Sequence, residues 1–331
     1  MGDMTSWRTW TAAAVLILLA APESLAWGAR LHMDISRAAA RSVPDEMGEW
    51  RRYARLMAAN SLNPDLWKQN DPTEGPRHFI DVERYRGFAI TNLPRDRAEF
   101  QAMGPVAAAA NGTLPWSIQE LQIRLTSAMA SNEWTEALCI AATLGHYVAD
   151  LHQPLHTTEN YDGTMGDDQG VHLRWEETMP MHYWRAMMLQ VGEVKHVPDL
   201  WPELLRWIQK AHMQYELVLT ADRAASKMAR GNTDSRVYYR SLWENTKDIF
   251  INQVSDAATH LASVWCTAWV NAGKPAIPRP PEGVPPESVW ARAGGRRAPS
   301  ALPFFIAFAA IAAVVIGLSL RRRPRQASSP S

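Results

Sequence analysis

Two histidine–carboxylate pairs at helical spacing are the residues of this sequence with the clearest chemical meaning. His146 and Asp150 are four positions apart, and so are His172 and Glu176. Side chains four residues apart on a helix lie about 6 Å from each other on one face, which suits two ligands of one metal ion. Zinc binds imidazole and carboxylate groups at about 2.0–2.2 Å. The two pairs therefore favour a zinc site, although one such pair alone is weak support for a metal.

Three more side chains could complete the coordination of such a site. Pro154 turns the chain after the first pair, so that His156 can come back toward it. Upstream, Asp65 and His78 add an oxygen and a nitrogen donor. Each histidine taken alone is more often a surface residue or a hydrogen-bonded core residue than a metal ligand. The prediction of a metal centre rests on their combination.

The N-terminal region predicts a further ligand of an unusual kind. A basic residue, an apolar stretch over 11–21 and small residues up to Ala26 have the order of a secretory signal peptide over 1–26. Cleavage after Ala26 would give Trp27 a free amine, which together with its own carbonyl can chelate a metal ion near His32. The apolar stretch is too short for a spanning helix, which needs about 20 residues. A signal anchor is the alternative, and it would remove Trp27 from the ligand set.

The segments that must position these residues have the periodicity of helices. Apolar residues recur at i, i+3 and i+4, and no run alternates with the period of a strand for long. A glycine- and aspartate-rich loop is expected over 159–171. We therefore expect a single all-α domain over 27–272, with long helices at 114–131, 133–152, 197–228 and 236–270.

Charge and cysteine content narrow the class of protein. The whole chain has 34 basic and 34 acidic residues, but acidic residues are in excess between 27 and 272. No basic patch of the kind that drives non-specific duplex binding is present, so a phosphate-bearing partner would have to be attracted by metal. Cys139 and Cys266 could form one disulfide in an exported protein or remain two buried thiols, and the sequence leaves both open.

The composition changes after residue 272. Six prolines between 275 and 286 make 273–301 a stiff, extended linker. It is followed by an uncharged stretch at 302–320, long enough for a transmembrane helix, and by an arginine-rich tail at 321–331 that should stay cytoplasmic. The expected protein is exported, faces outward and is anchored in the membrane by this helix. A sorting tail that is removed, leaving a secreted protein, is the alternative.

Residues 144–156 (LGHYVADLHQPLH) resemble the central motif of a known superfamily. Its members are the single-strand-specific zinc nucleases of fungi and plants and the related bacterial zinc-dependent phospholipases C. The segments 64–68 (PDLWK) and 78–81 (HFID), the N-terminal Trp27 with His32, and the pair at 172 and 176 occur in the order of that family. The resemblance covers essentially all of 27–272.

The resemblance implies a cleft with three zinc ions, which Asp150 helps to bridge. The first ion would be held by Asp65, His78, His146 and Asp150. The second would be held by His156, His172 and Glu176. The third would be held by the amine and carbonyl of Trp27, by His32 and by the other oxygen of Asp150.

The resemblance also implies a chemistry, the hydrolysis of phosphodiester bonds by a metal-bound hydroxide. Asp65, Lys68 and Asp150 are then the residues with catalytic roles. Lys68 stands where the nucleases have a basic residue near the scissile phosphate, or else it is a solvated lysine beside Trp67. A second-shell hydrogen bond is expected of His152, and no role is expected of His182, His196, His212 and His260.

The substrate is less clear than the metal centre. In the nucleases, the residues at the positions of Phe79 and Asp81 stack on and hydrogen-bond a base, but the phospholipases have a similar segment. Glu176 stands where fungal and plant nucleases have Asp, and residues 167–170 (DDQG) replace a Gly-Gly-Asn; together with the region of Asn160, these features favour a phospholipase C. The N-terminal Trp27-Gly28 and residues 152–156 (HQPLH) look more like the nucleases. We therefore rank a single-strand nuclease with nucleotide 3′-phosphatase activity first, acting on single-stranded nucleic acid or nucleotides as a monomer. A phospholipase C acting on phospholipid ranks second, and a non-catalytic, metal-stabilised binding domain ranks third.

Overall fold

A computed structural model describes residues 28–85, 89–96, 98, 110–163 and 169–280 of the chain. No β-strand occurs among these residues; Ile80 and Gly112 form an isolated bridge. The α-helices are α1 (Ala29–Arg41), α2 (Ala54–Asn60), α3 (Asn63–Trp67), α5 (Leu114–Ala130), α6 (Trp134–Leu151), α7 (Val171–Leu173), α8 (Met179–Tyr183), α9 (Leu200–Met228) and α10 (Arg236–Asn271). Shorter turns are η1 (Asp45–Tyr53), η2 (Gly75–His78), η3 (Val82–Arg84), η4 (Ile90–Asn92), η5 (Pro154–Thr157), η6 (Arg174–Thr178) and η7 (Ala186–Met188).

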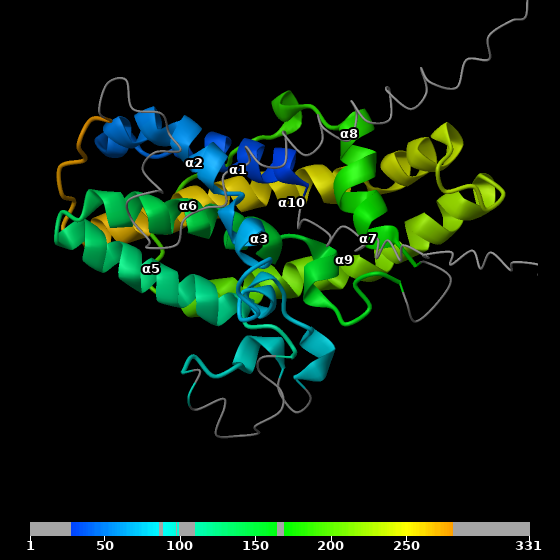
Figure 1. The fold of residues 1–331 in the computed structure, drawn as a ribbon, viewed down its shortest axis with the longest axis horizontal. Helices are drawn as coiled ribbons and strands as arrows, with labels where there is room; N and C mark the ends of the chain where they lie inside the picture. The colour runs from blue at the N-terminus through cyan, green and yellow to red at the C-terminus, as the bar shows by residue number, and fades with distance from the viewer. Residues whose placement is uncertain (1–27, 86–88, 97, 99–109, 164–168, 281–331) are drawn as a thin grey trace, which may run out of the picture.

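The four long helices expected from periodicity are confirmed as α5, α6, α9 and α10, and with them the all-α fold class. Helix α9 begins at Leu200, later than expected, because the Asp199 side chain accepts a hydrogen bond from the Trp201 N–H and caps the helix. Helix α6 ends at Leu151, before Pro154. Figure 1 shows the long helices lying along the long axis of the molecule, with α1 and α2 on one side of them.

Helix α6 lies at the centre of the domain. It packs against α1, α2, α5 and α10, and every residue of α6 from Ala137 to Leu151 is buried. A helix that is covered on all sides is apolar around its whole circumference. His146 and Asp150, which α6 carries near its end, are therefore in the interior and need partners there.

The described residues at the start of the predicted proline-rich linker lie against the helices. The Trp269 indole donates to the Pro275 carbonyl at 2.9 Å, and the Tyr53 hydroxyl donates to the Pro278 carbonyl at 2.8 Å. None of the described helices is long and apolar enough to cross a membrane. The predicted signal peptide (1–26), transmembrane helix (302–320) and basic tail (321–331) lie outside the described residues.

Both cysteines are buried free thiols. Cys139 belongs to α6 and Cys266 to α10. Burial raises the pKa of the Cys139 thiol to about 12. Of the two alternatives left open by the sequence, the structure has the pair of buried thiols.

Candidate metal centre

The last turns of α6 bring His146 and Asp150 to the middle of the candidate site. The His146 Nδ1–H donates to the Ser61 carbonyl at 2.7 Å, which leaves Nε2 facing Asp150 Oδ2 at 3.2 Å. Burial lowers the pKa of His146, but the charges of Asp150 and Asp65 outweigh it and raise this pKa to about 10. The surroundings of Nε2 therefore favour a positive charge there, whether from a proton or from a metal ion.

Two segments upstream of α6 add further donors around the same point. His78 closes η2, and its Nδ1 lies 2.9 Å from Asp150 Oδ2 and 3.0 Å from His146 Nε2. Asp65 belongs to α3, and its Oδ1 lies 3.5 Å from His146 Nε2. Burial opposes ionisation of Asp65, yet His146 and its neighbours hold the pKa of this carboxyl well below its usual range. Asp65, His78 and His146 form one group of ligand atoms close enough to bind a single ion.

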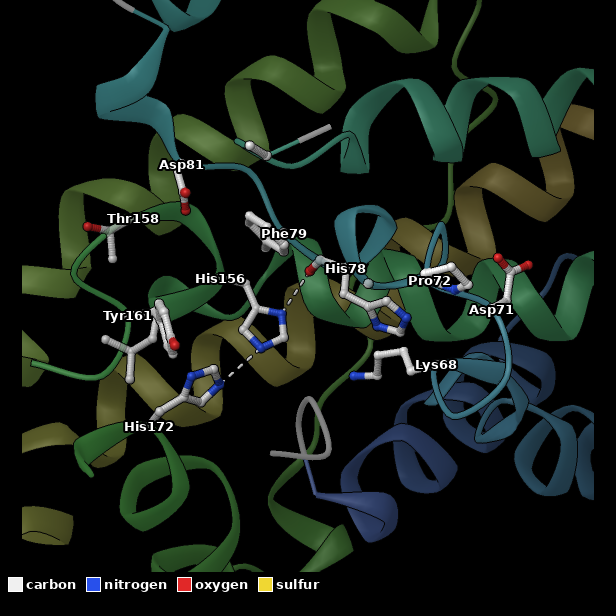
Figure 2. Close-up of a pocket in the computed structure, with 13 residues that line it drawn as sticks. Lys68, Asp71, Pro72, His78, Phe79, Asp81, His156, Thr158, Tyr161 and His172 are labelled. Carbon is white, nitrogen blue, oxygen red and sulfur yellow. Dashed lines mark hydrogen bonds between the residues drawn. The ribbon is translucent and has the colours of Figure 1, made fainter. Parts of the chain in front are cut away.

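A second group of donors comes from η5, α7 and η6. The His156 Nδ1–H donates to the His78 carbonyl at 2.9 Å, and its Nε2 lies 3.1 Å from His172 Nε2 (Figure 2). Glu176 Oε2 lies 2.9 Å from His172 Nε2 and 3.6 Å from His156 Nε2. All three side chains are buried, and their ligand atoms can meet on one ion.

The segment that carries His172 and Glu176 differs from the helix expected. The chain passes from α7 into a π-helical turn, η6, between the two ligands. Such turns are rare and are frequently found at functional sites. Arg174 fastens the turn to α9 and α10. Its Nη2 lies 3.0 and 3.1 Å from the two carboxylate oxygens of Asp222 in α9, and its Nε lies 2.8 Å from the Tyr238 hydroxyl in α10.

The third group of donors joins α1 to α6. His32 Nε2 lies 3.5 Å from Asp150 Oδ1, and the His32 ring stacks on His146 with centroids 3.9 Å apart. Gly145 permits this approach, because a Cβ atom there would lie 2.5 Å from Ser36 Oγ. His32, His146 and Asp150 can also meet on one ion. Trp27 lies outside the described residues, so its amine and carbonyl stay a predicted part of this group.

Asp150 lies close to a histidine of each of the three groups. The atoms around its carboxylate show whether zinc would fit. Its Oδ1 is buried and makes no hydrogen bond to a described residue, while His32 and His156 lie 3.5 and 3.7 Å away. Burial opposes its charge, but His146, His156 and His78 hold its pKa well below the usual range. An ionised carboxylate ringed by imidazole nitrogens is the donor set that zinc prefers. The residues present therefore fit zinc.

A cavity of about 760 Å³ opens beside these donors. Lys68 lines it and is not a solvated lysine: its side chain is 16% exposed and its Nζ lies 2.7 Å from Asp65 Oδ1. Burial lowers the pKa of Lys68, but the charges of Asp65, Asp150 and Glu176 raise it overall, so the cation is retained. The cavity is lined by Lys68, Asp71, Pro72, Gly75, His78, Phe79, Asp81, Ala110, Leu155, His156, Thr158, Tyr161 and His172.

Phe79 and Asp81, the expected substrate contacts, lie on the cavity wall (Figure 2). Burial and the charge of Glu83 raise the pKa of Asp81 to about 6, against the opposing charge of Arg84. Sequence reasoning missed Tyr161, which is half exposed at the cavity with its ring centroid 5.5 Å from that of His172. An aromatic residue within the polar loop 159–171 was the available signal.

The expectation for His152 is wrong, whereas His212 is an ordinary hydrogen-bonded histidine, as expected. His152 donates to the Val148 carbonyl, and its Nε2 lies 2.7 Å from His260 Nδ1, so its hydrogen bonds do not reach a ligand candidate. His212, which was not expected to bind metal, hydrogen-bonds the Thr157 carbonyl at 2.9 Å. That contact steadies η5, the turn that carries His156.

Comparison with known proteins agrees with the resemblance seen in the motifs. The family model described as S1/P1 Nuclease matches residues 27–276, which span every donor named above. No curated protein matches the chain. The family is zinc-dependent and acts on phosphodiester bonds in nucleic acid, in accord with the histidine and carboxylate groups found here. The chain belongs to the S1/P1 nuclease family.

Proposed function

We propose that this protein is a trinuclear-zinc nuclease that cleaves single-stranded nucleic acid and removes 3′-phosphates from nucleotides. The observation that carries the proposal is that Asp150 lies close to a histidine of each of the three donor groups, beside a cavity that is also lined by the cation Lys68 and the ring of Phe79. The family match supports the reaction class, and the donor geometry supports the metal.

The proposed ligands are divided among three ions as the resemblance implies. Bound zinc would supply positive charge next to the phosphoryl oxygens and lower the pKa of a coordinated water. Asp150 would help to hold two of the ions, because its Oδ1 faces His32 and its Oδ2 faces His78. Lys68 holds a second source of positive charge at the cavity wall, where it can neutralise a phosphate oxygen.

The organic part of the substrate would lie along Phe79 and Asp81. A nucleobase stacked on an aromatic ring gains about 1–3 kcal/mol, and only an unpaired base presents its face. The Asp81 carboxylate can accept a hydrogen bond from the edge of that base. These two contacts favour a single strand over a duplex.

The structure weakens one of the sequence features that favoured a phospholipase C, the glutamate at position 176. Glu176 reaches His172 Nε2 at 2.9 Å from the π-helical turn, so a glutamate there completes the donor group as an aspartate would. The family match gives the lipid alternative no support. Phospholipid hydrolysis is therefore an outcome to be tested rather than a second proposal.

A paired assay tests the substrate. The purified full chain is offered single-stranded DNA, duplex DNA and phosphatidylcholine vesicles, with and without a chelator. We expect chelator-sensitive cleavage of the single strand, restored by zinc. Release of phosphocholine without nucleotide release would overturn the proposal, and fewer than about two zinc ions per chain would favour the non-catalytic alternative.

We also propose that the protein is exported as a monomer, begins at Trp27 after processing, and faces outward on its C-terminal helix. The signal-like order of 1–26 and the arginines after 320 support this topology. N-terminal sequencing of the natural product tests the cleavage, and protease protection of tagged cells tests the orientation. A first residue other than Trp27 would remove the amine from the third donor group.

A further inference from the structure

Glu74 is a buried carboxylate that the proposed reaction does not use. It is 2% exposed and lies immediately before η2, the turn that carries His78. A buried carboxylate is costly unless charged or hydrogen-bonding groups surround it. The groups around Glu74 therefore indicate what it is for.

Two of these groups hold Glu74 in place. The Tyr147 hydroxyl donates to Glu74 Oε1, and Arg77 Nη1 lies 3.9 Å from Oε2. Burial and the Glu74 charge raise the pKa of Tyr147 well above its ordinary value, so its hydroxyl keeps the proton that it donates. Tyr147 belongs to α6 and is adjacent to His146, so Glu74 is tied to the helix at the centre of the donor groups.

The third group is the far side of the His78 ring. Its Nδ1 faces Asp150 and His146, while its Nε2 points the other way and lies 3.5 Å from Glu74 Oε1. This Nε2 is buried and makes no hydrogen bond to any described residue. A ligating histidine commonly directs its second nitrogen to a carboxylate, which fixes the tautomer and the ring orientation and makes the first nitrogen a stronger donor.

We propose that Glu74 is a positioning residue for the metal centre: it faces the Nε2–H of His78 and turns Nδ1 of the same ring toward the ion shared with Asp65 and His146. Tyr147 fixes Glu74 in turn. The inference rests on the metal centre proposed above, since without a bound ion there is nothing for His78 to be positioned against.

The test compares Glu74→Gln with Glu120→Gln in the full chain. Glu120 is the matched control, because its carboxylate also lies near Arg77, at 3.8 Å, but is 53% exposed and reaches no donor of the metal centre. Zinc retention is titrated against a competing chelator, and the visible absorption of the cobalt-substituted protein reports ligand geometry. We expect Glu74→Gln to weaken retention of one ion about 10–100-fold and to alter the cobalt spectrum, with Glu120→Gln unchanged.

A second variant guards against a simple failure to fold. Tyr147→Phe keeps Glu74 and the ring against His78 but removes the hydroxyl donor, so a smaller weakening of zinc retention is expected. Full zinc retention and an unaltered cobalt spectrum in Glu74→Gln would overturn the proposal. If Glu74→Gln does not fold, full zinc retention and an unaltered cobalt spectrum in Tyr147→Phe would overturn it instead. Absence of zinc from the unmodified chain would instead contradict the proposed function.

Discussion

His146 and Asp150 are held by a helix that is buried on every side, whereas His172 and Glu176 are held by a short segment that side-chain hydrogen bonds fix to its neighbours. On the α6 side, position is set by close packing, as the fit of Gly145 against Ser36 shows. On the η6 side, position is set by the Arg174 contacts to α9 and α10.

The difference teaches where each half of the centre is vulnerable. Packing errors around α6 affect the whole domain, because α6 contacts α1, α2, α5 and α10. Loss of a polar contact at η6 affects a single turn. Gln153 links the two halves, since it donates to Glu176 Oε2 at 2.9 Å while its own oxygen accepts from the Leu155 N–H.

The largest effect is expected from Asp150→Asn. This carboxylate faces His32, His78, His146 and His156, so its loss should remove about two ions, whereas Glu176→Gln should remove about one. Loss of metal charge at the phosphoryl group is worth several kcal/mol, or about a thousandfold in rate. Zinc analysis and single-strand cleavage measure both. Equal zinc loss in the two variants would contradict the central position of Asp150.

Next in size is the packing of α1 on α6. Gly145→Ala places a Cβ atom 2.5 Å from Ser36 Oγ. Overpacking of this kind costs about 1–3 kcal/mol, while alanine gains about 1 kcal/mol over glycine within a helix. We expect a net loss in the free energy of unfolding, measured with urea.

The control for this packing effect is the same change in a Ser36→Ala background. Removing Oγ removes the clash, so Gly145→Ala should then stabilise the domain, and the sign of its effect should reverse. A loss of the same size in both backgrounds would show that Ser36 does not limit the approach of α1.

The η6 side is tested by Arg174→Met, with Arg223→Met as its control. Arg174 contacts Asp222 in space, and Arg223 follows Asp222 in the sequence. Arg223 is exposed on α9 and hydrogen-bonds Thr220 of the same helix. Loss of the Arg174 contacts should free η6 and weaken retention of the ion held by His172 and Glu176 about tenfold or more. Hydrogen exchange should rise in 169–178 and stay unchanged in α6. Protection lost equally in α6 would contradict the separation of the two halves.

Much of the fold could be predicted because long helices have a local signature. The apolar period gave α5, α6, α9 and α10 within a few residues, and the donors stood at recognisable spacings. The π-helical turn could not be predicted, because it depends on Arg174 meeting Asp222 and Tyr238, which are 48 and 64 residues away. The contact of Glu74 with Tyr147 spans 73 residues. No local periodicity encodes such contacts.

The state of the cysteines and of Lys68 was ambiguous for the same reason. Their sequence neighbours allow a disulfide or two thiols, and a catalytic or a solvated lysine. Lys68 and Asp65 are only three residues apart, so their ion pair is local, but the packing of α3 beside α6 places the pair where both side chains are largely covered. The tertiary contacts that settle a side chain's environment are the part of a fold that composition and spacing leave undetermined.

The last predicted effect concerns base preference on the cavity wall. Burial and the charges of Glu83 and Glu159 raise the pKa of Asp81 to about 6, although the charge of Arg84 opposes this shift. Asp81 is therefore ionised above pH 6 and neutral below it. A carboxylate that accepts a hydrogen bond from a base should therefore confer its preference above pH 6 and lose it as the pH falls. A hydrogen bond to a charged group is worth about 1.5–3 kcal/mol, which corresponds to about tenfold or more in the ratio of kcat/KM between bases.

The measured quantity is the ratio of kcat/KM for two dinucleotides that differ in one base. Any effect of pH on the metal centre changes both values equally and cancels in this ratio. Asp81→Asn should flatten the pH dependence of that ratio while leaving zinc retention unchanged, because Asp81 belongs to none of the three donor groups. A ratio that still changes near pH 6 in Asp81→Asn would place base recognition elsewhere on the wall, and Tyr161, half exposed beside His172, is then the group to test.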